Sequence, residues 1–507
     1  MSRINTNVQS LLAQRVLGQN NNTLNTSLER LSTGLRVNRG ADDPAGLIAS
    51  ENLRSELSAA NAAIGNAERA DQVVNIAEGG LQEISSLLTE LQGLLTSSAN
   101  DAGLSGEEKE ANQLQVDSIL QTIDRIAGET KFQGRNLLNG SLDFTTSSVG
   151  SQVADFQING AKFDATSLDV DINVTGSAQQ AGLYLSFGGT AVNLGGATGS
   201  AFTIEIAGVD GNRELSFASG TSLTDVAATI NSFSDVTGVE ATTSGTGISL
   251  NSSDFGGSAF VSVDVVTAAN VQGSGIFTFS STDANTVATS SAQTFASTAA
   301  ANGIRDDGQD IEAFVNGLKA TTDGRSLSVS SDFLDIEFEL ETANAQTLAS
   351  FQALSITGGG AEFQLGSSVD LNGKVSLGIQ DVQSRQLGRF VDSSSNTRFL
   401  DDLGSGSDLN LVDGDLTAAQ EVVSNAISQV SSLRGRLGAF QANTIGSTIR
   451  NLQVGVENTA AAESQIRDAD FAAETANLTR SQILVSAATN SLSLANSQPQ
   501  NVLQLLG

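Results

Sequence analysis

Apolar residues recur at helical spacing near both ends of this chain, in long stretches that contain almost no proline. Leucines three, four and seven residues apart predict a first helix over about residues 4–36. Beyond Pro44, alternating steps of three and four residues continue as far as Leu95 and predict one long helix with a coiled-coil seam. A third helix is predicted from Gly106 to Ile126, because its apolar residues share one face.

The helical pattern returns at about Thr417 and continues towards the C-terminus. Steps of three and four residues lead as far as Phe440, but the next apolar residue of the seam is Ile445, five positions further on. The register of the seam therefore slips by one residue at this point. A last helix follows, and we expect Pro499 to end it, because proline lacks the N–H that the helical hydrogen bond needs.

Between residues 141 and 405 the pattern changes to alternation of apolar and polar residues, which predicts β-strands. Ser222 and Asp225 form a capping box, which predicts a short helix among these strands. Residues 280–302 have low complexity and are expected to form a loop. Three dipeptides typical of β-hairpin turns separate alternating segments: Asp210-Gly211, Asp323-Gly324 and Asn372-Gly373. The middle of the chain is therefore predicted to hold one or two β-rich domains.

Together these patterns predict an α+β fold. Long α-helical coiled-coil terminal domains pair the N- and C-terminal segments, and a β-rich variable middle region is inserted between them. A helix of fifty residues is about 75 Å long, so one compact globule cannot cover it. We therefore expect other copies of the chain to complete the apolar seams. The residues predicted to form these subunit packing seams are Leu24, Leu28, Leu31, Leu35, Val74, Leu81, Ile84, Leu88, Leu91, Leu95, Val430, Leu437, Leu484 and Leu492.

The composition excludes several classes of function. The chain holds 25 basic and 56 acidic residues, a net charge of −31, which argues against a nucleic acid partner because phosphate binding needs a basic surface. It contains no Cys and no His, so thiol nucleophiles, Ser-His-Asp triads and zinc sites with these ligands are excluded. No calcium loop of the EF-hand type is present. We expect no enzyme, cofactor or metal site, although a pair of catalytic carboxylates remains open.

No membrane insertion is expected, because the chain has no apolar stretch long enough to cross a bilayer. The first residues also lack the apolar run and the small-residue cleavage site of a secretory signal peptide. If the protein leaves the cell, its export route must recognise something other than a cleavable signal.

Two terminal stretches resemble the signatures of the bacterial flagellins. The segment Ser27–Glu56, SLERLSTGLRVNRGADDPAGLIASENLRSE, is similar to the N-terminal signature of that family. The segment Ser464–Leu506, which includes Gln498-Pro499-Gln500-Asn501-Val502-Leu503, is similar to the C-terminal signature. Residues 223–250 resemble the small repeat module inserted in many flagellins and hook-associated proteins. The two terminal signatures stand in the expected order at the two ends of one chain.

The resemblance implies a structural subunit that polymerises into the flagellar filament, which serves swimming motility as a helical propeller. It implies an inner-tube helical domain of residues 1–42 plus 468–507 and an outer-tube helical domain of residues 43–140 plus 406–467. Residues 141–405 would form the variable, surface-exposed β-rich region, including a small module near residues 200–266.

The implied partners are other copies of the chain, an export chaperone, and the cap and hook-junction proteins. The implied location is the extracellular filament, reached by flagellar type III export without a cleavable signal peptide. The alternative is a hook–filament junction protein, which shares the terminal signatures and also forms a tubular layer.

The resemblance also assigns two smaller features. Gly40, Asp42, Asp43 and Pro44 would form a hinge or linker between the two helical domains, with Asp43 as the cap and Pro44 in the first turn of the long helix. In flagellins that an innate Toll-like receptor detects, the long helix carries an arginine in the receptor contact. Glu90 stands at the matching position here, and Gln115 stands where a glutamate contact falls. These degenerate positions imply weak or absent activation of the receptor.

Overall fold

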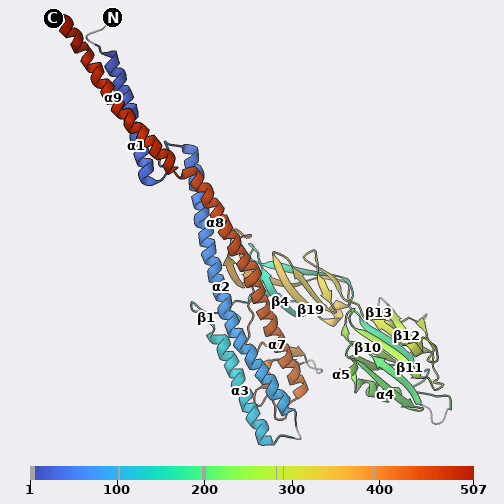
Figure 1. Cartoon of the computed structure of the whole chain (residues 1–507). Helices are drawn as coiled ribbons and strands as arrows, with labels where there is room; N and C mark the ends of the chain where they lie inside the picture. The colour runs from blue at the N-terminus through green and yellow to red at the C-terminus, as the bar shows by residue number, and fades with distance from the viewer. Residues whose placement is uncertain are drawn as a thin grey trace. The chain divides into compact units, whose positions relative to one another are not determined.

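The computed structural model contains long helices from both ends of the chain and a β-rich middle, which confirms the predicted α+β class (Figure 1). It describes residues 6–100, 103–196, 201–280, 283–288, 291–391 and 396–506. The chain divides into two compact units. Unit 1 comprises Met1–Asn75, Phe363–Lys374 and Gly435–Gly507, and unit 2 comprises Ile76–Glu362 and Val375–Arg434.

The predicted terminal helices all form, with boundaries set by local capping. Gly34 ends the first helix because its φ of 73° is a left-handed conformation that glycine adopts without strain. Asp43 begins the long second helix, since its side-chain oxygen accepts a hydrogen bond from the Gly46 N–H at 2.9 Å. The main helices are α1 (Val8–Thr33), α2 (Pro44–Ser98), α3 (Gly106–Glu129), α7 (Leu416–Ala439), α8 (Gly446–Arg467) and α9 (Phe471–Leu506).

The expected end of the last helix at Pro499 is wrong, because α9 continues to Leu506. Proline cannot donate the helical hydrogen bond to the carbonyl four residues earlier, which belongs to Ala495. That carbonyl accepts a hydrogen bond from Asn7 Nδ2 at 2.8 Å instead. The side chain of a residue near the other end of the chain thus satisfies the carbonyl that Pro499 leaves without its helical donor, and the helix passes through.

The slip in the C-terminal seam is accommodated by a π-helical turn, η4 (Phe440–Ile445), between α7 and α8. A π turn holds one more residue than an α turn. Phe440 and Ile445 are therefore both buried, although five positions separate them.

Unit 2 carries two β domains with separate hydrophobic cores. In β domain 1 a five-stranded antiparallel sheet, in the order β16-β15-β5-β20-β3, and a four-stranded sheet, in the order β17-β18-β19-β4, share one core. Its strands are β3 (Phe144–Ser147), β4 (Val153–Ala161), β5 (Leu168–Gly176), β15 (Glu312–Val315), β16 (Leu318–Lys319), β17 (Thr321–Asp323), β18 (Ser326–Ser330), β19 (Leu334–Leu340) and β20 (Ser350–Gly359).

In the sequence, β domain 2 is inserted between β5 and β15. Its two sheets run in the orders β13-β12-β6-β10-β9 and β14-β11-β7-β8. Its strands are β6 (Gln180–Ser186), β7 (Ala201–Ala207), β8 (Asn212–Ala218), β9 (Val239–Ser244), β10 (Gly247–Phe255), β11 (Phe260–Thr267), β12 (Gly275–Ser280), β13 (Asp283–Val287) and β14 (Ile304–Asp307), with helices α4 (Leu223–Asn231) and α5 (Ser234–Thr237). The predicted capping box is present, because the Ser222 side chain accepts a hydrogen bond from the Asp225 N–H.

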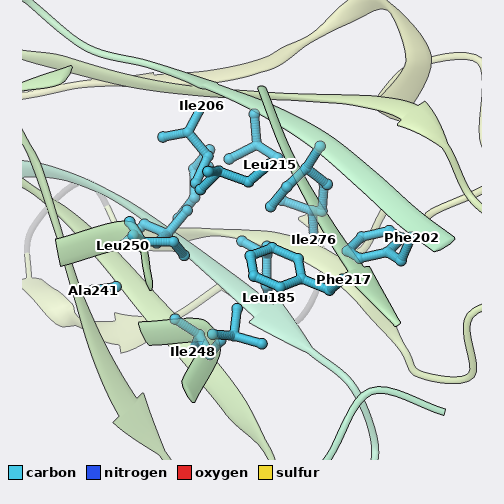
Figure 2. Packing of buried hydrophobic residues seen from close by; sticks show 14 of the residues in the cluster. Leu185, Phe202, Ile206, Leu215, Phe217, Ala241, Ile248, Leu250 and Ile276 are labelled. Atoms are coloured by element: carbon cyan, nitrogen blue, oxygen red, sulfur yellow. The ribbon is translucent and has the colours of Figure 1, made fainter. Parts of the chain in front are cut away.

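The core of β domain 2 is built from both sheets, and Figure 2 shows Leu185, Phe202, Leu250 and Ile276 converging on it. The ring of Phe202 meets that of Phe295 at 5.2 Å in an edge-to-face arrangement. Phe295 lies in the segment 280–302, which was expected to be a loop. That expectation is wrong for β13, which pairs with β12, and for Phe295, although residues 281–282 and 289–290 lie outside the described part of the chain.

The remaining elements are short. Three two-stranded hairpins are β1 (Lys131–Phe132) with β2 (Arg135–Asn136), β21 (Ala361–Gln364) with β22 (Lys374–Leu377), and β23 (Phe390–Val391) with β24 (Thr397–Arg398). The short helical turns are α6 (Thr342–Ala345), η2 (Ala300–Asn302) and η3 (Leu400–Leu403). The three predicted hairpin dipeptides fall in or beside the turns between β7 and β8, β17 and β18, and β21 and β22.

Replacing the fully buried Phe202 by alanine is expected to destabilise β domain 2 by about 3–5 kcal/mol, because it removes a large ring and leaves a cavity. The single tyrosine of the chain, Tyr184, lies in β6 of this domain, and the chain has no tryptophan, so tyrosine fluorescence during urea unfolding reports on this domain. Phe333→Ala is the control, since Phe333 is 51% exposed. An equal loss of stability in both variants would contradict the assignment of the core.

Candidate assembly surface

Helices α1 and α9 of unit 1 lie side by side and antiparallel, with polar contacts between them (Figure 1). Besides the bond from Asn7 to Ala495, the Ser10 hydroxyl hydrogen-bonds to Asn496 Oδ1 at 2.7 Å, and Asn20 Nδ2 donates to the Leu484 carbonyl at 3.3 Å. The buried residues of this pair are almost all small or polar: Ser10, Ser27, Glu474, Ser481 and Ala488. The contact between the two helices is therefore not an apolar seam.

The large apolar side chains of the same two helices point outward. Val8 is 65% exposed, Ile483 is 64% exposed and Leu494 is 69% exposed. Leu11, Leu12, Val16, Leu28, Phe471 and Leu484 are exposed as well. Soluble helix pairs place apolar residues between the helices and polar residues outside. This pair has the reverse arrangement, and a large exposed apolar surface marks an interaction site.

One side chain ties the start of α1 to the end of α9. Asn7 accepts a hydrogen bond from the Ser10 N–H through Oδ1 at 3.0 Å, which caps α1, and donates through Nδ2 to the Ala495 carbonyl. Because Pro499 leaves that carbonyl without its helical donor, the bond also fixes the axial register of the two helices.

The connection between α1 and α2 is ordered by backbone and carboxylate contacts. The Arg36 N–H donates to the Arg467 carbonyl at 2.6 Å, and the Ala469 N–H donates to the Gly34 carbonyl at 2.9 Å, so this segment pairs with the connection between α8 and α9. Of the predicted hinge residues, Asp42 accepts hydrogen bonds from the backbone N–H groups of Arg39 at 2.8 Å and Asn38 at 3.1 Å.

These contacts also act on ionisation. The two backbone hydrogen bonds, that from Arg39 first, hold the pKa of Asp42 below its usual value, and the nearby Arg30 adds to the effect. Pro44 occupies the first turn of α2 after the Asp43 cap, as predicted, and Gly40 lies in the turn between the two helices. A hinge role for these residues stays a prediction.

Along α2 and the C-terminal helices, the predicted seam residues are mostly buried within this one chain. Eight of them are fully or almost fully buried: Val74, Leu81, Ile84, Leu88, Leu91, Leu95, Val430 and Leu437. Leu24, Leu31, Leu35 and Leu492 are half-buried, and Leu28 and Leu484 are exposed. The chain itself therefore covers the central part of the predicted seams. The part left for other copies lies on α1 and α9.

Charged and polar contacts accompany the packing along α2. Within unit 1, Arg467 of α8 pairs with Glu51 of α2 at 3.0 Å. A hydrogen bond from Arg54, with Arg467 adding a smaller effect, lowers the pKa of Glu51. Within unit 2, Arg434 of α7 pairs with Glu78 at 2.9 Å. These pairs place α7 and α8 along α2.

Sequence reasoning missed most of the outward-facing residues, including Val8, Leu11, Ile483 and Leu494. The available signal was the adjacent apolar pairs, Leu11-Leu12 and Ile483-Leu484. Neighbouring residues on a helix point about 100° apart, so both members of such a pair cannot face a single partner helix.

Of the two receptor-related positions, Glu90 lies on α2 and Gln115 on α3, and both side chains are exposed in unit 2. Among the described residues, no cluster of three or more acidic side chains is arranged to hold a metal ion. Within the same described ranges, no helix combines the length and the apolar character needed to cross a membrane.

Comparisons with known proteins agree with this architecture. The model of the bacterial flagellin N-terminal helical region matches residues 4–143, and that of the C-terminal helical region matches residues 420–506. The flagellin hook IN motif matches residues 201–254, which contain β7 to β10 of β domain 2.

The B-type flagellin of Pseudomonas aeruginosa is 31% identical, and the match covers 99% of this chain and 99% of the relative. The chain belongs to the bacterial flagellin family. Flagellin A of Helicobacter pylori, at 26% identity, and flagellin of Salmonella choleraesuis, at 26% identity, match this flagellin over the same 99% of both chains. Among solved structures, FliC from Burkholderia pseudomallei is 14% identical with a TM-score of 0.23, covering 74% of this chain and 99% of that chain.

Replacing Asn7 by alanine is expected to loosen α1 from α9, because it removes the α1 cap and leaves the Ala495 carbonyl without a donor. The cost is about 1–2 kcal/mol, which raises amide hydrogen exchange of residues 8–20 roughly tenfold in the monomer. Asn22→Ala is the matched control, since the Asn22 side chain is exposed on the same helix. Equal exchange rates in the two variants would count against the assigned role.

Proposed function

We propose that this flagellin is a structural subunit that polymerises into the flagellar filament, and that α1 and α9 supply the surface that holds neighbouring copies together. The observation that carries the proposal is the reversed α1–α9 pair, in which small and polar residues lie between the helices and large apolar residues face outward. A second copy supplies the matching surface, because every copy exposes the same apolar side chains.

The energetics favour assembly over a free monomer. Burying one leucine, isoleucine or valine side chain contributes about 1.5–3 kcal/mol. The nine exposed apolar residues on α1 and α9 (Val8, Leu11, Leu12, Val16, Leu28, Phe471, Ile483, Leu484 and Leu494) therefore supply more than 10 kcal/mol in total, before the cost of ordering the helices is subtracted. A head-to-tail contact of this kind that does not close into a ring generates an open helical filament.

The role is mechanical and needs no catalysis. We infer an extracellular filament reached by flagellar export without a cleavable signal peptide, with the filament serving swimming motility. The partners we infer are other copies of the chain, the export chaperone, and the cap and hook-junction proteins. We propose that residues 1–42 with 468–507 form the inner tube, that residues 43–140 with 406–467 form the outer tube, and that the β domains project into solvent, where their acidic side chains keep neighbouring subunits apart.

The second candidate is a hook–filament junction protein, which shares the helical terminal regions. The relatives named flagellin, which match 99% of the chain, favour the filament subunit. Electron microscopy of the purified, assembled protein distinguishes the two. Long filaments support the filament subunit, whereas assemblies that stop at a short collar support the junction protein.

Placing a charge in the outward apolar surface is expected to block assembly without unfolding the monomer. Leu11→Asp and Ile483→Asp would each bury an unpaired carboxylate between subunits, at a cost of about 3 kcal/mol or more, which is at least a hundredfold rise in the critical concentration. Gln14→Asp is the control, because Gln14 is already an exposed polar residue of α1. Sedimentation and electron microscopy measure assembly, and circular dichroism verifies the fold. Normal filaments from Leu11→Asp would contradict the proposed surface.

Glu90 and Gln115 are expected to make this flagellin a weak activator of the innate receptor that detects other members of the family. A negative charge at Glu90 reverses the charge of the arginine expected in the receptor contact. Purified monomer in a receptor reporter-cell assay should give little response, and the double variant Glu90→Arg with Gln115→Glu should give more. A full response of the unmodified protein at nanomolar dose would refute the expectation.

A further inference from the structure

The C-terminal helices of unit 1 hold one residue more than their seam requires. In an α-helix, apolar residues of one seam follow steps of three and four. Phe440 and Ile445 are five positions apart and both buried, and the π turn η4 holds the additional residue between them. The apolar residues on either side of η4 keep their regular spacing, so the additional residue is confined to this one turn.

The helix around η4 is weakly held by its own backbone. Gly435, Gly438 and Gly446 flank the turn, and glycine lowers helix stability more than any residue except proline. A side chain placed at Gly435 or Gly438 would have no neighbour within 4 Å, so close packing does not explain these glycines. The Ser447 hydroxyl donates to the Asn443 carbonyl and, at 3.2 Å, to the Thr444 carbonyl, so it competes for the helical carbonyls of the wide turn.

Two contacts connect η4 to its surroundings in unit 1. Gln441 Nε2 donates to Asp71 Oδ1 at 2.8 Å and to Asn75 Oδ1 at 3.0 Å, and these two residues lie one turn apart on α2. The Phe440 ring lies 6.1 Å from the Phe363 ring of the β21–β22 hairpin. The hairpin residues Phe363–Lys374 belong to unit 1, although their neighbours in the sequence belong to unit 2.

We propose that η4 is a sliding joint between α7 and α8. When the wide turn moves by one residue, one wide hydrogen bond breaks and another forms, while the helices on both sides stay intact. Such a step moves α8 about 1.5 Å along α2, the rise of one helical residue. Gln441 keeps a partner during this movement, because Asp71 and Asn75 both present an acceptor to it. The hairpin packed on Phe440 senses the state of the joint.

The consequence for the filament rests on the proposed function. A tube whose subunits all have one conformation is a straight helix by symmetry. Curvature needs subunits that pack at two or more lengths, and two-state elements of this kind produce such a difference. The joint therefore gives identical subunits two axial lengths in one filament, and with them the curved form that a propeller needs.

Deleting Ala442, an exposed residue within η4, tests the joint. The deletion places Phe440 and Ile445 four positions apart, so an ordinary α-helix then carries the whole seam. The deletion variant is expected to fold with an unchanged or higher melting temperature, measured by circular dichroism. We expect its filaments to be straight in electron micrographs, whereas wild-type filaments and those of the control Ala442→Ser are curved.

Filaments of the deletion variant that keep the wild-type curvature would overturn the joint, and so would wild-type filaments that are themselves straight. Hydrogen exchange of the wild-type monomer tests the joint without assembly or mutation. The amides of residues 441–446 are expected to exchange at least tenfold faster than those of residues 420–432 in α7, and equal protection would overturn the joint. A wild-type chain that forms no filament contradicts the proposed function instead, and the exchange experiment then decides the joint alone.

Discussion

The structure depends on one constraint: the terminal helices cannot hide their large apolar side chains within a single chain. Helices α1 and α9 use their mutual contact for Asn7, Ser10, Asn20 and small residues, so Val8, Leu11 and Ile483 have no partner in the monomer. The hydrophobic effect then favours any arrangement that covers these side chains. Because every copy exposes the same surface, self-association satisfies the constraint without another component.

The β domains solve the same problem in the opposite way. Each has two sheets around its own core, and residues such as Phe202 and Ile172 are fully buried there. These domains need no other copy for stability, and an excess of acidic over basic residues in the whole chain favours a solvated surface. The chain thus separates a part that is complete by itself from ends that are complete only in an assembly. This division suits a protein that must remain soluble before it polymerises.

Two irregularities in the helices have the same logic. Pro499 removes a helical donor and η4 holds an additional residue, yet in both places the helix continues because a side chain supplies what the backbone lacks. Asn7 donates to the carbonyl that Pro499 leaves open, and Gln441 of η4 is held by Asp71 and Asn75 of α2. Both irregularities therefore lie at contacts between segments distant in sequence, where a local change of geometry affects how the helices are positioned.

The sequence by itself determined the features that follow from local periodicity. Steps of three and four residues gave the helices, alternation with turn dipeptides gave the strands, the slip at Ile445 marked the place of η4, and the terminal signatures indicated the family. It did not determine that α9 passes through Pro499, that β13 forms and Phe295 joins a core, or that the buried face of α1 is polar. Each of these was decided by a tertiary contact, such as the one between Asn7 and Ala495, whose energy is absent from the local pattern. An apolar pattern shows that a residue will be buried, but whether its own chain or another copy covers it depends on the geometry of the whole fold.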